Sequence, residues 1–456
     1  AGAAGAAGGL SAAEKQAMLL ETLQELAGGY LEVCRRQLDG EEVGTRAEGP
    51  ALLLAAIRSL LSSLSPLDEI APQAQLEQRA RRMCEQLAKR AVEEQTAKLQ
   101  AALVGIVKGL GLAATTAGAD ALHAVMQTAA AAVGGAVRET LAASAPLLAP
   151  LSDVLRLPPD AMACHLVLKL QAALHALANT ALQPCTEPSS ALLRAGLCAQ
   201  MATEGVAHVQ ALLKQQLSPA GLGGAADALE AAPTQRLMRG AADHALQTFV
   251  ELQAQAVSHE LQAAVRAANL LSGPPPREVS PCVEQLLARL RALQSSAAQI
   301  FPGEAPRAML PQGPFPVASA AALQLGATSR GEIHKGMQRM FARQISLDLD
   351  LGAGEKHAIA RMLTQVVKLA LKTLVETVRL GTYSRHGVQQ LQVDCGMLRW
   401  VLPACVVDEG AVLALLDEAI VASQDRSLEP SGAVEPAVLE RLCEHKRQQL
   451  LAGLAG

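Results

Sequence analysis

The chain has 456 residues, of which half are hydrophobic and only 2% aromatic, and its formal net charge at pH 7 is −4. Charges of both signs are interspersed, which excludes the large basic surface that collects phosphates, so we expect no nucleic-acid partner. A chain of this length can bury a sizeable core, which must here consist of Leu, Ala, Val and Met. Because Ala and Leu favour helices over strands, the composition predicts an all-α protein.

The cysteines predict a reducing compartment. Nine of them are scattered without any CxxC pair, a pattern that favours neither a zinc module nor a disulfide framework. Free thiols are typical of the cytosol. No secretory signal is visible, and the longest uncharged runs are rich in Ala, so we expect none to span a membrane. Because the first residue is Ala, we expect the sequence to be part of a longer chain.

Apolar residues recur at helical spacing through the first two thirds of the chain. Helices are predicted over residues 10–38, 51–64, 72–110, 119–148, 161–182, 189–217, 234–271 and 280–300. Pro66 should end the second helix, and Ser280 should be the N-cap of the last, with Pro281 at its first position. We interpret residues 1–271 as a helical rod region and residues 272–300 as a connecting helix.

The last third of the chain begins with a linker. Residues 301–329 form a Pro-rich linker with little charge. Helices are then predicted over residues 330–345, 355–380, 385–402, 410–423 and 435–451. Residues 330–456 are therefore expected to form a C-terminal helical bundle. No fixed repeat length is present, and the whole pattern predicts an elongated helical rod of stacked helical bundles.

Two short motifs suggest ligands but lack the context that those ligands need. The run Gly109-Leu110-Gly111 begins a GxGxxA pattern, which binds a dinucleotide when it follows a strand. It follows a helical run here, so a helix end capped by Gly is favoured. Residues 348–352 alternate Asp and Leu like a calcium loop, but the twelfth place holds Ile359 instead of Glu. We therefore expect no cofactor and no metal.

Residues 380–395, LGTYSRHGVQQLQVDC, differ from the rest of the chain because polar groups are interleaved with apolar ones. A stripe at steps of three and four predicts core positions, namely Val388, Leu391, Cys395, Leu398 and Leu402. His386 and Cys395 fall on opposite helix faces, which argues against a nucleophile pair. The remaining positions are candidate interhelix or partner contacts: Arg385, Gly387, Gln389, Gln390, Gln392 and Asp394. Gly387 should allow a close helix approach.

This stretch, with residues 370–376 before it and 415–423 after it, resembles the C-terminal region of the vacuolar protein sorting-associated fifty-one family, also called fat-free homologs. The family tends to show an aromatic residue before a Gly and then an aliphatic-Gln-Gln-aliphatic-Gln-Val-Asp-Cys run. His386 stands where the aromatic residue is usual. Specific matching covers roughly residues 330–425, and the remainder is compatible in its helical pattern.

The resemblance implies a non-catalytic subunit of the Golgi-associated retrograde protein tether, which captures endosome-derived carriers at the trans-Golgi network. A sister assembly acts in endocytic recycling. The implied partners are the other tether subunits, and SNARE proteins through an N-terminal segment of the family that we do not find here. The implied location is the cytosolic face of the trans-Golgi network and endosomes, with peripheral membrane association through partners.

Two alternatives to this function remain open. The first is a subunit of another helical-rod tether, either exocyst or the oligomeric Golgi complex. The second is an enzyme with a cryptic helical active site, which a deep pocket with converging titratable groups would favour.

Overall fold

The computed structural model describes residues 11–38, 49–70, 75–117, 121–158, 160–268, 270–301, 311, 358–430 and 432–455. Every regular element in these ranges is a helix, so the predicted all-α fold is confirmed. Between these helices the described residues contain one isolated β-bridge, which joins Tyr383 to Ser427. The chain divides into two compact units, which we describe separately.

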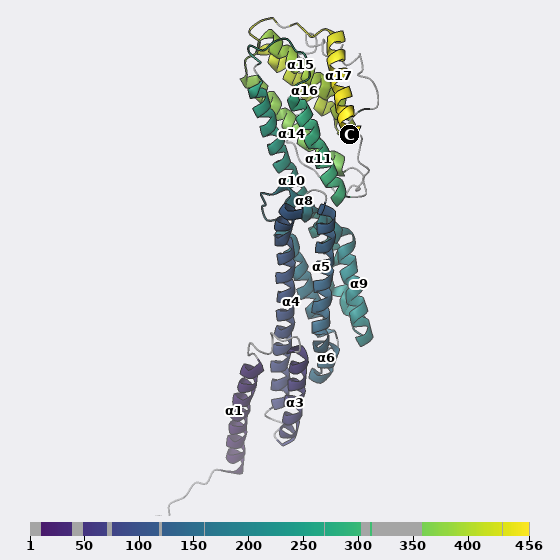
Figure 1. The fold of residues 1–456 in the computed structure, drawn as a ribbon. Helices are drawn as coiled ribbons and strands as arrows, with labels where there is room; N and C mark the ends of the chain where they lie inside the picture. Colours follow the sequence, from purple (N-terminus) through teal and green to yellow (C-terminus); the bar gives the residue numbers. More distant parts are fainter. Residues whose placement is uncertain are drawn as a thin grey trace, which may run out of the picture. The chain divides into compact units, whose positions relative to one another are not determined.

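Unit 1 comprises Ala1–Lys108, Ala129–Thr180 and Gln200–Met238. Its helices, labelled in Figure 1, are α1 (Ala12–Leu38), α3 (Gly49–Ile70), the first part of α4 (Leu76–Ala117), most of α5 (Leu122–Ser144), α6 (Ala149–Leu155), α7 (Ala161–Ala181) and α9 (Val206–Leu217). Its core includes one face of α7, where Leu166, Leu170 and Leu174 are fully buried. The spacing of four residues between these leucines is what the helical period requires of a buried face.

Among the residues that the structure describes, two helices are long and apolar enough to cross a membrane by length and composition alone. They are Leu76–Ala114 of α4 and the whole of α7. More than half of the apolar window in α7 is buried inside the protein. Core packing therefore accounts for the composition of α7, because a helix buried on most sides is apolar on most sides.

Unit 2 comprises Gly109–Thr128, Ala181–Ala199 and Arg239–Gly456. Its helices are α8 (Pro188–Gln200), most of α10 (Ala231–Ala267), α11 (Pro281–Ile300), α14 (Ala358–Leu380), α15 (Arg385–Val401), α16 (Glu409–Asp425) and α17 (Pro436–Ala455). Helix α15 packs against α11, α16 and α17, and α14 packs against α11 and α16, as Figure 1 shows. Helix α15 thus has packed neighbours on several sides.

Several predicted helix boundaries are wrong for physical reasons. Helix α3 continues through Pro66, where the carbonyl freed by the missing N–H belongs to the exposed Ser62 and can face water. Helix α4 continues through Gly109 and Gly111, because its buried stripe carries on beyond them to Ala114. The predicted helix 189–217 is interrupted by a π-helical turn at Met201–Gly205.

Part of the predicted C-terminal region lies outside the residues that the structure describes. Within the Pro-rich linker 301–329 the structure describes only Phe301 and Pro311. The predicted helix 330–345 and the acidic loop 348–352 lie outside the described residues. The division into a rod region, a connecting helix, a linker and a bundle therefore stays a prediction.

Candidate functional site

The segment that enters α15 is extended and fixed from two sides. The backbone N–H of Tyr383 donates to the carbonyl of Arg426 at 3.2 Å, and Leu428 N donates to the carbonyl of Tyr383 at 2.9 Å. The phenol of Tyr383 turns back and donates to the carbonyl of Val378 at 3.1 Å. A Cβ at Gly381 would lie 2.3 Å from that phenol oxygen, so the ring position requires Gly there. The entry to α15 is therefore tied both to α14 and to the segment after α16.

The N-cap of α15 also holds the segment that joins α10 to α11. We call residues 268–280 the α10–α11 connector. The hydroxyl of Ser384 accepts from the backbone N–H of Gly387 at 3.2 Å, which caps the helix. The backbone N–H and the hydroxyl of Ser384 both approach the carbonyl of Leu270, at 3.0 and 3.2 Å respectively. One serine thus caps α15 and fixes the connector.

Gly387 lies directly against the connector. A Cβ built on Gly387 would be 1.9 Å from the carbonyl oxygen of Leu270 and 2.8 Å from its carbonyl carbon. These are backbone atoms, which cannot move aside as the end of a flexible side chain can. The sequence predicted a close approach at Gly387, and the segment that makes the approach is the connector rather than another helix.

One turn further along α15, Gln390 fixes the end of the connector. Its side-chain nitrogen donates to the carbonyl of Glu278 at 3.0 Å. The same nitrogen lies 3.1 Å from the hydroxyl oxygen of Ser280 and 3.1 Å from Oδ1 of Asp394. An amide has two N–H groups, so these three acceptors share two donors.

Asp394 lies one helical turn after Gln390 and is 8% exposed. We call Gln390 and Asp394 the polar row of α15. Its Oδ1 accepts from the backbone N–H of Ser280 at 2.8 Å, and its Oδ2 accepts from the Ser280 hydroxyl at 2.6 Å. Ser280 does occupy the N-cap of α11 with Pro281 at the first position, as predicted, but its side chain makes no capping hydrogen bond to α11. The hydroxyl donates to Asp394 instead.

Burial governs the ionisation of this site. It raises the pKa of Asp394 from 3.8 to about 6, although hydrogen bonds from Ser280 and Gln390 favour the charged form. Burial, and then the charge of Asp394, raises the pKa of the Cys282 thiol to about 12. The same two causes raise the pKa of Cys443 to about 12. Both thiols are therefore protonated at neutral pH and are poor nucleophiles.

The other candidate residues have different surroundings. Gln392 is 1% exposed, and its Oε1 accepts from the backbone N–H of Val434 in the segment before α17, at 3.0 Å. Its Nε2 has no hydrogen-bond partner among the described residues. Gln389 is half-buried and lies 3.1 Å from a ring nitrogen of His386. Arg385 is exposed, and no ion pair or hydrogen bond joins it to another described side chain. Arg385 is thus the most exposed of the six candidates.

A cleft of about 580 Å³ adjoins Asp394. Its walls come from the last turns of α10, the connector, the start of α11, and α15; they include Ala264, Leu270, Cys282 and Leu391. Asp394 already accepts three hydrogen bonds there, and the thiol of Cys282 is protonated. No cluster of three or more metal-binding side chains occurs among the described residues. The cleft therefore offers neither an activated nucleophile nor an ion site in the part of the chain that the structure describes.

Sequence reasoning missed the partners of the polar row. Ser280 and Glu278 lie more than 100 positions before Gln390 and Asp394, so no local period could pair them. Three ion pairs that fasten the bundle were missed for the same reason: Lys368–Asp408, Arg379–Glu418 and Arg399–Asp417. The predicted apolar stripe of α15 is confirmed, because all five of its residues are buried.

The sequence matches eight curated proteins that share one name, Vacuolar protein sorting-associated protein 51 homolog. The Gallus gallus protein is 28% identical over 277 residues, which is 57% of this chain and 34% of that protein. The resemblance to this family is confirmed. The Homo sapiens homolog is 27% identical over 273 residues, with the same coverage of both chains. The Arabidopsis thaliana homolog is 28% identical over 229 residues, or 46% of this chain and 28% of that protein.

These matches cover only part of each protein. The chain spans about a third of the length of the fifty-one homologs that it matches. No protein-family model matches the chain. No solved structure matches it either. The likeness therefore rests on the sequences of the fifty-one homologs.

Proposed function

We propose that this chain is a non-catalytic subunit of a vesicle-tethering complex that acts in retrograde transport from endosomes to the trans-Golgi network. The observation that carries the proposal is the match to eight fifty-one homologs from animals and a plant, at 26–28% identity over about half of the chain. The all-helical fold is compatible with such a subunit. The same proposal includes a location at the cytosolic face of the trans-Golgi network and endosomes, with membrane association through protein partners. It also includes endocytic recycling as a second transport process.

The chemistry of the polar row supports a role in assembly rather than in catalysis. In α15, Gln390 and Asp394 are satisfied by atoms of the same unit. The neighbouring thiol of Cys282 is neutral at physiological pH because its pKa is raised to about 12. Such groups fix one arrangement of helices, and a fixed arrangement of helices presents a defined surface to partners.

Within this proposal, Arg385 and Gln389 are the candidate partner contacts. Arg385 is exposed at the first turn of α15, and Gln389 follows one helical turn later. An exposed guanidinium can recognise a carboxylate of a partner with two hydrogen bonds. The other four candidates are proposed as internal contacts of unit 2, because the atoms that they meet belong to that unit.

Affinity purification tests the proposal. The full-length protein, tagged in its own cells, should recover the other subunits of the retrograde tether. Recovery of exocyst or oligomeric Golgi complex subunits instead would favour the first alternative, and recovery of no tether subunit would refute the proposal. Arg385→Glu should reduce recovery of one subunit, whereas Arg441→Glu on an exposed position of α17 provides the matched control.

A further inference from the structure

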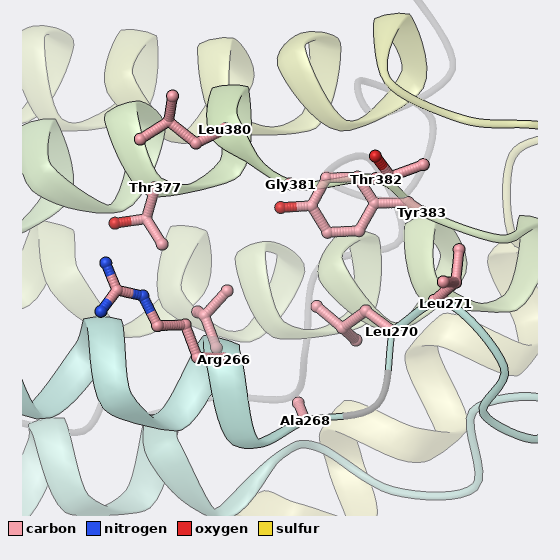
Figure 2. A pocket seen from close by; sticks show the side chains of 10 residues that line it. Arg266, Ala268, Leu270, Leu271, Thr377, Leu380, Gly381, Thr382 and Tyr383 are labelled. Atoms are coloured by element: carbon pink, nitrogen blue, oxygen red, sulfur yellow. The ribbon is translucent and has the colours of Figure 1, made fainter.

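A second pocket shares Ala268 and Leu270 with the cleft beside Asp394 but does not include Asp394 in its lining. It has a volume of about 300 Å³ and is lined by the end of α10, the connector, the last turn of α14 and residues 381–383. Figure 2 shows the side chain of Arg266 extending from α10 toward Thr377 of α14, with Leu270 facing the ring of Tyr383. The position between two helix ends leaves this pocket open to solvent.

The lining of this pocket includes exposed leucines from two different segments. Leu271 of the connector is 51% exposed, and Leu380 at the end of α14 is 83% exposed. Isolated exposed leucines are common, but two at the mouth of one pocket form an apolar patch of the kind that contacts other proteins.

Arg266 is the only charged residue among the described residues that line the pocket. It is exposed, and it has no ion pair or hydrogen bond with another described side chain. An apolar hollow with one free guanidinium at its wall complements an aliphatic side chain that is close to a carboxylate.

The backbone at this pocket also offers an unused pairing edge. In an extended segment, the N–H and C=O groups of successive residues point to alternate sides. Those of Tyr383 face Arg426 and Leu428, and the N–H of Ser384 faces Leu270 on the pocket side. The backbone groups of Thr382 therefore also face the pocket side, and they make no hydrogen bond within the described part of the chain. Thr382 can pair with one residue of an extended peptide.

We propose that this pocket binds an extended segment of a partner protein in which an aliphatic residue is followed two positions later by Asp or Glu. Residues at that spacing project from the same face of an extended chain. The aliphatic side chain enters the pocket beside Leu270, the carboxylate pairs with Arg266, and the peptide backbone pairs with Thr382. This inference does not depend on the tethering function, because it concerns the surface of the purified chain alone.

The test uses a nonapeptide, Thr-Thr-Thr-Leu-Thr-Glu-Thr-Thr-Thr, with a fluorinated label read by fluorine NMR as the whole 456-residue chain is added. We expect saturable binding that weakens about tenfold when Glu is moved one position closer to Leu, because the two side chains then project from opposite faces. N-methylation of the backbone beside the Leu should weaken binding to a similar degree, since it removes the pairing with Thr382.

Matched variants locate the binding site. Arg266→Glu and Leu380→Asp each change an exposed residue, and each should weaken binding about tenfold or more. Arg239→Glu, at an exposed position of the same helix, and Leu112→Asp, at a residue 73% exposed, should change it less than about twofold.

Three results would overturn the inference. The first is no saturable binding, or binding that Arg266→Glu leaves unchanged. The second is binding of anionic phosphatidylserine vesicles that Leu380→Asp abolishes, in the absence of peptide binding, which would identify a lipid surface. The third is self-association of the chain that the same variant abolishes, which would identify a second copy as the occupant. Loss of tether subunits in affinity purification would leave this inference untouched.

Discussion

Gly387→Ala tests whether the close contact between α15 and the connector holds unit 2 together. The new methyl group would start 1.9 Å from the Leu270 carbonyl oxygen, whereas an ordinary contact begins at 3.4 Å, so the connector must move by about 1.5 Å. Overpacking of this kind costs about 1–3 kcal/mol. The shift also breaks the hydrogen bond from Ser384 N to Leu270, which is worth about 1 kcal/mol. We expect a loss of about 3 kcal/mol in the free energy of unfolding.

Trp400 provides the assay. It is the single tryptophan of the chain, and it is buried near the end of α15, so its fluorescence reports the unfolding of unit 2. With a urea slope of about 2 kcal/mol per molar, the expected loss lowers the unfolding midpoint by about 1.5 M. Hydrogen exchange should also quicken in the connector.

Gly240→Ala is the matched control. Gly240 lies inside α10, and a Cβ there would meet no atom within 4 Å. The helix should therefore gain about 0.5–1 kcal/mol from the better helix former. Both changes add one methyl group. They should nevertheless move the midpoint in opposite directions, because only the methyl group at Gly387 meets backbone atoms of another segment. A Gly387→Ala midpoint equal to or above that of the natural chain would refute the argument.

Three further predictions concern α15 and its hydrogen-bond partner Ser280, and they use the same Trp400 assay. The pKa of Asp394 is raised to about 6 in the fold, so this carboxyl stabilises the fold below pH 4 and the contribution is lost as pH rises through about 6, a change of about 3 kcal/mol. Asp394→Asn should remove that part of the dependence of unfolding free energy on pH. The part that comes from Asp417, whose pKa is also raised by burial, should remain. If Asp394→Asn left the whole pH dependence unchanged, the raised pKa of Asp394 would be contradicted. Ser280→Ala removes a hydrogen bond that favours the charged carboxylate, so the pKa of Asp394 in the fold rises further and the loss of stability should continue to a higher pH; a loss that is complete at a lower pH would show the opposite sign. Leu398→Asp buries a charge without a partner at a residue that is 3% exposed, and should abolish the cooperative transition; unchanged melting would mean that the stripe is not core.

The sequence predicted those features of α15 that depend on local period. The stripe from Val388 to Leu402 follows from steps of three and four, which place all its members on one face wherever the helix packs. This prediction needed no knowledge of the neighbouring elements, and for that reason it held. Gly387 was expected to allow a close helix approach because only Gly lacks a side chain, but the segment that lies against it is the connector.

The polar face of α15 could not be predicted in the same way. Asp394 lies outside the apolar stripe, and that position fits either a solvated residue or an interhelix contact. Which of the two it is depends on where Ser280 lies in space. A capping serine is recognised from its place before Pro281, yet the pattern does not show that its hydroxyl donates to another helix. The helix ends failed for a related reason: Gly109 weakens a helix locally, but burial of the same face before and after it, at Val107 and Ala114, continues the helix.

The contacts of α15 explain why a polar sequence stands at the centre of an apolar bundle. Ser384, Gly387, Gln390 and Asp394 meet backbone atoms of the connector, and Gln392 meets a backbone N–H before α17. Apolar packing is tolerant of small displacements, whereas a hydrogen bond to a particular backbone group is lost within about an ångström. A buried carboxylate that loses its hydrogen-bond donors costs several kcal/mol. A shift in the register of α15 therefore costs more free energy with Asp394 in place than it would with a Leu at that position. We therefore infer that the polar residues of α15 select one register of the connector. The pocket with Arg266 is lined in part by Leu270 and Leu271 of that connector, so its shape depends on the same register.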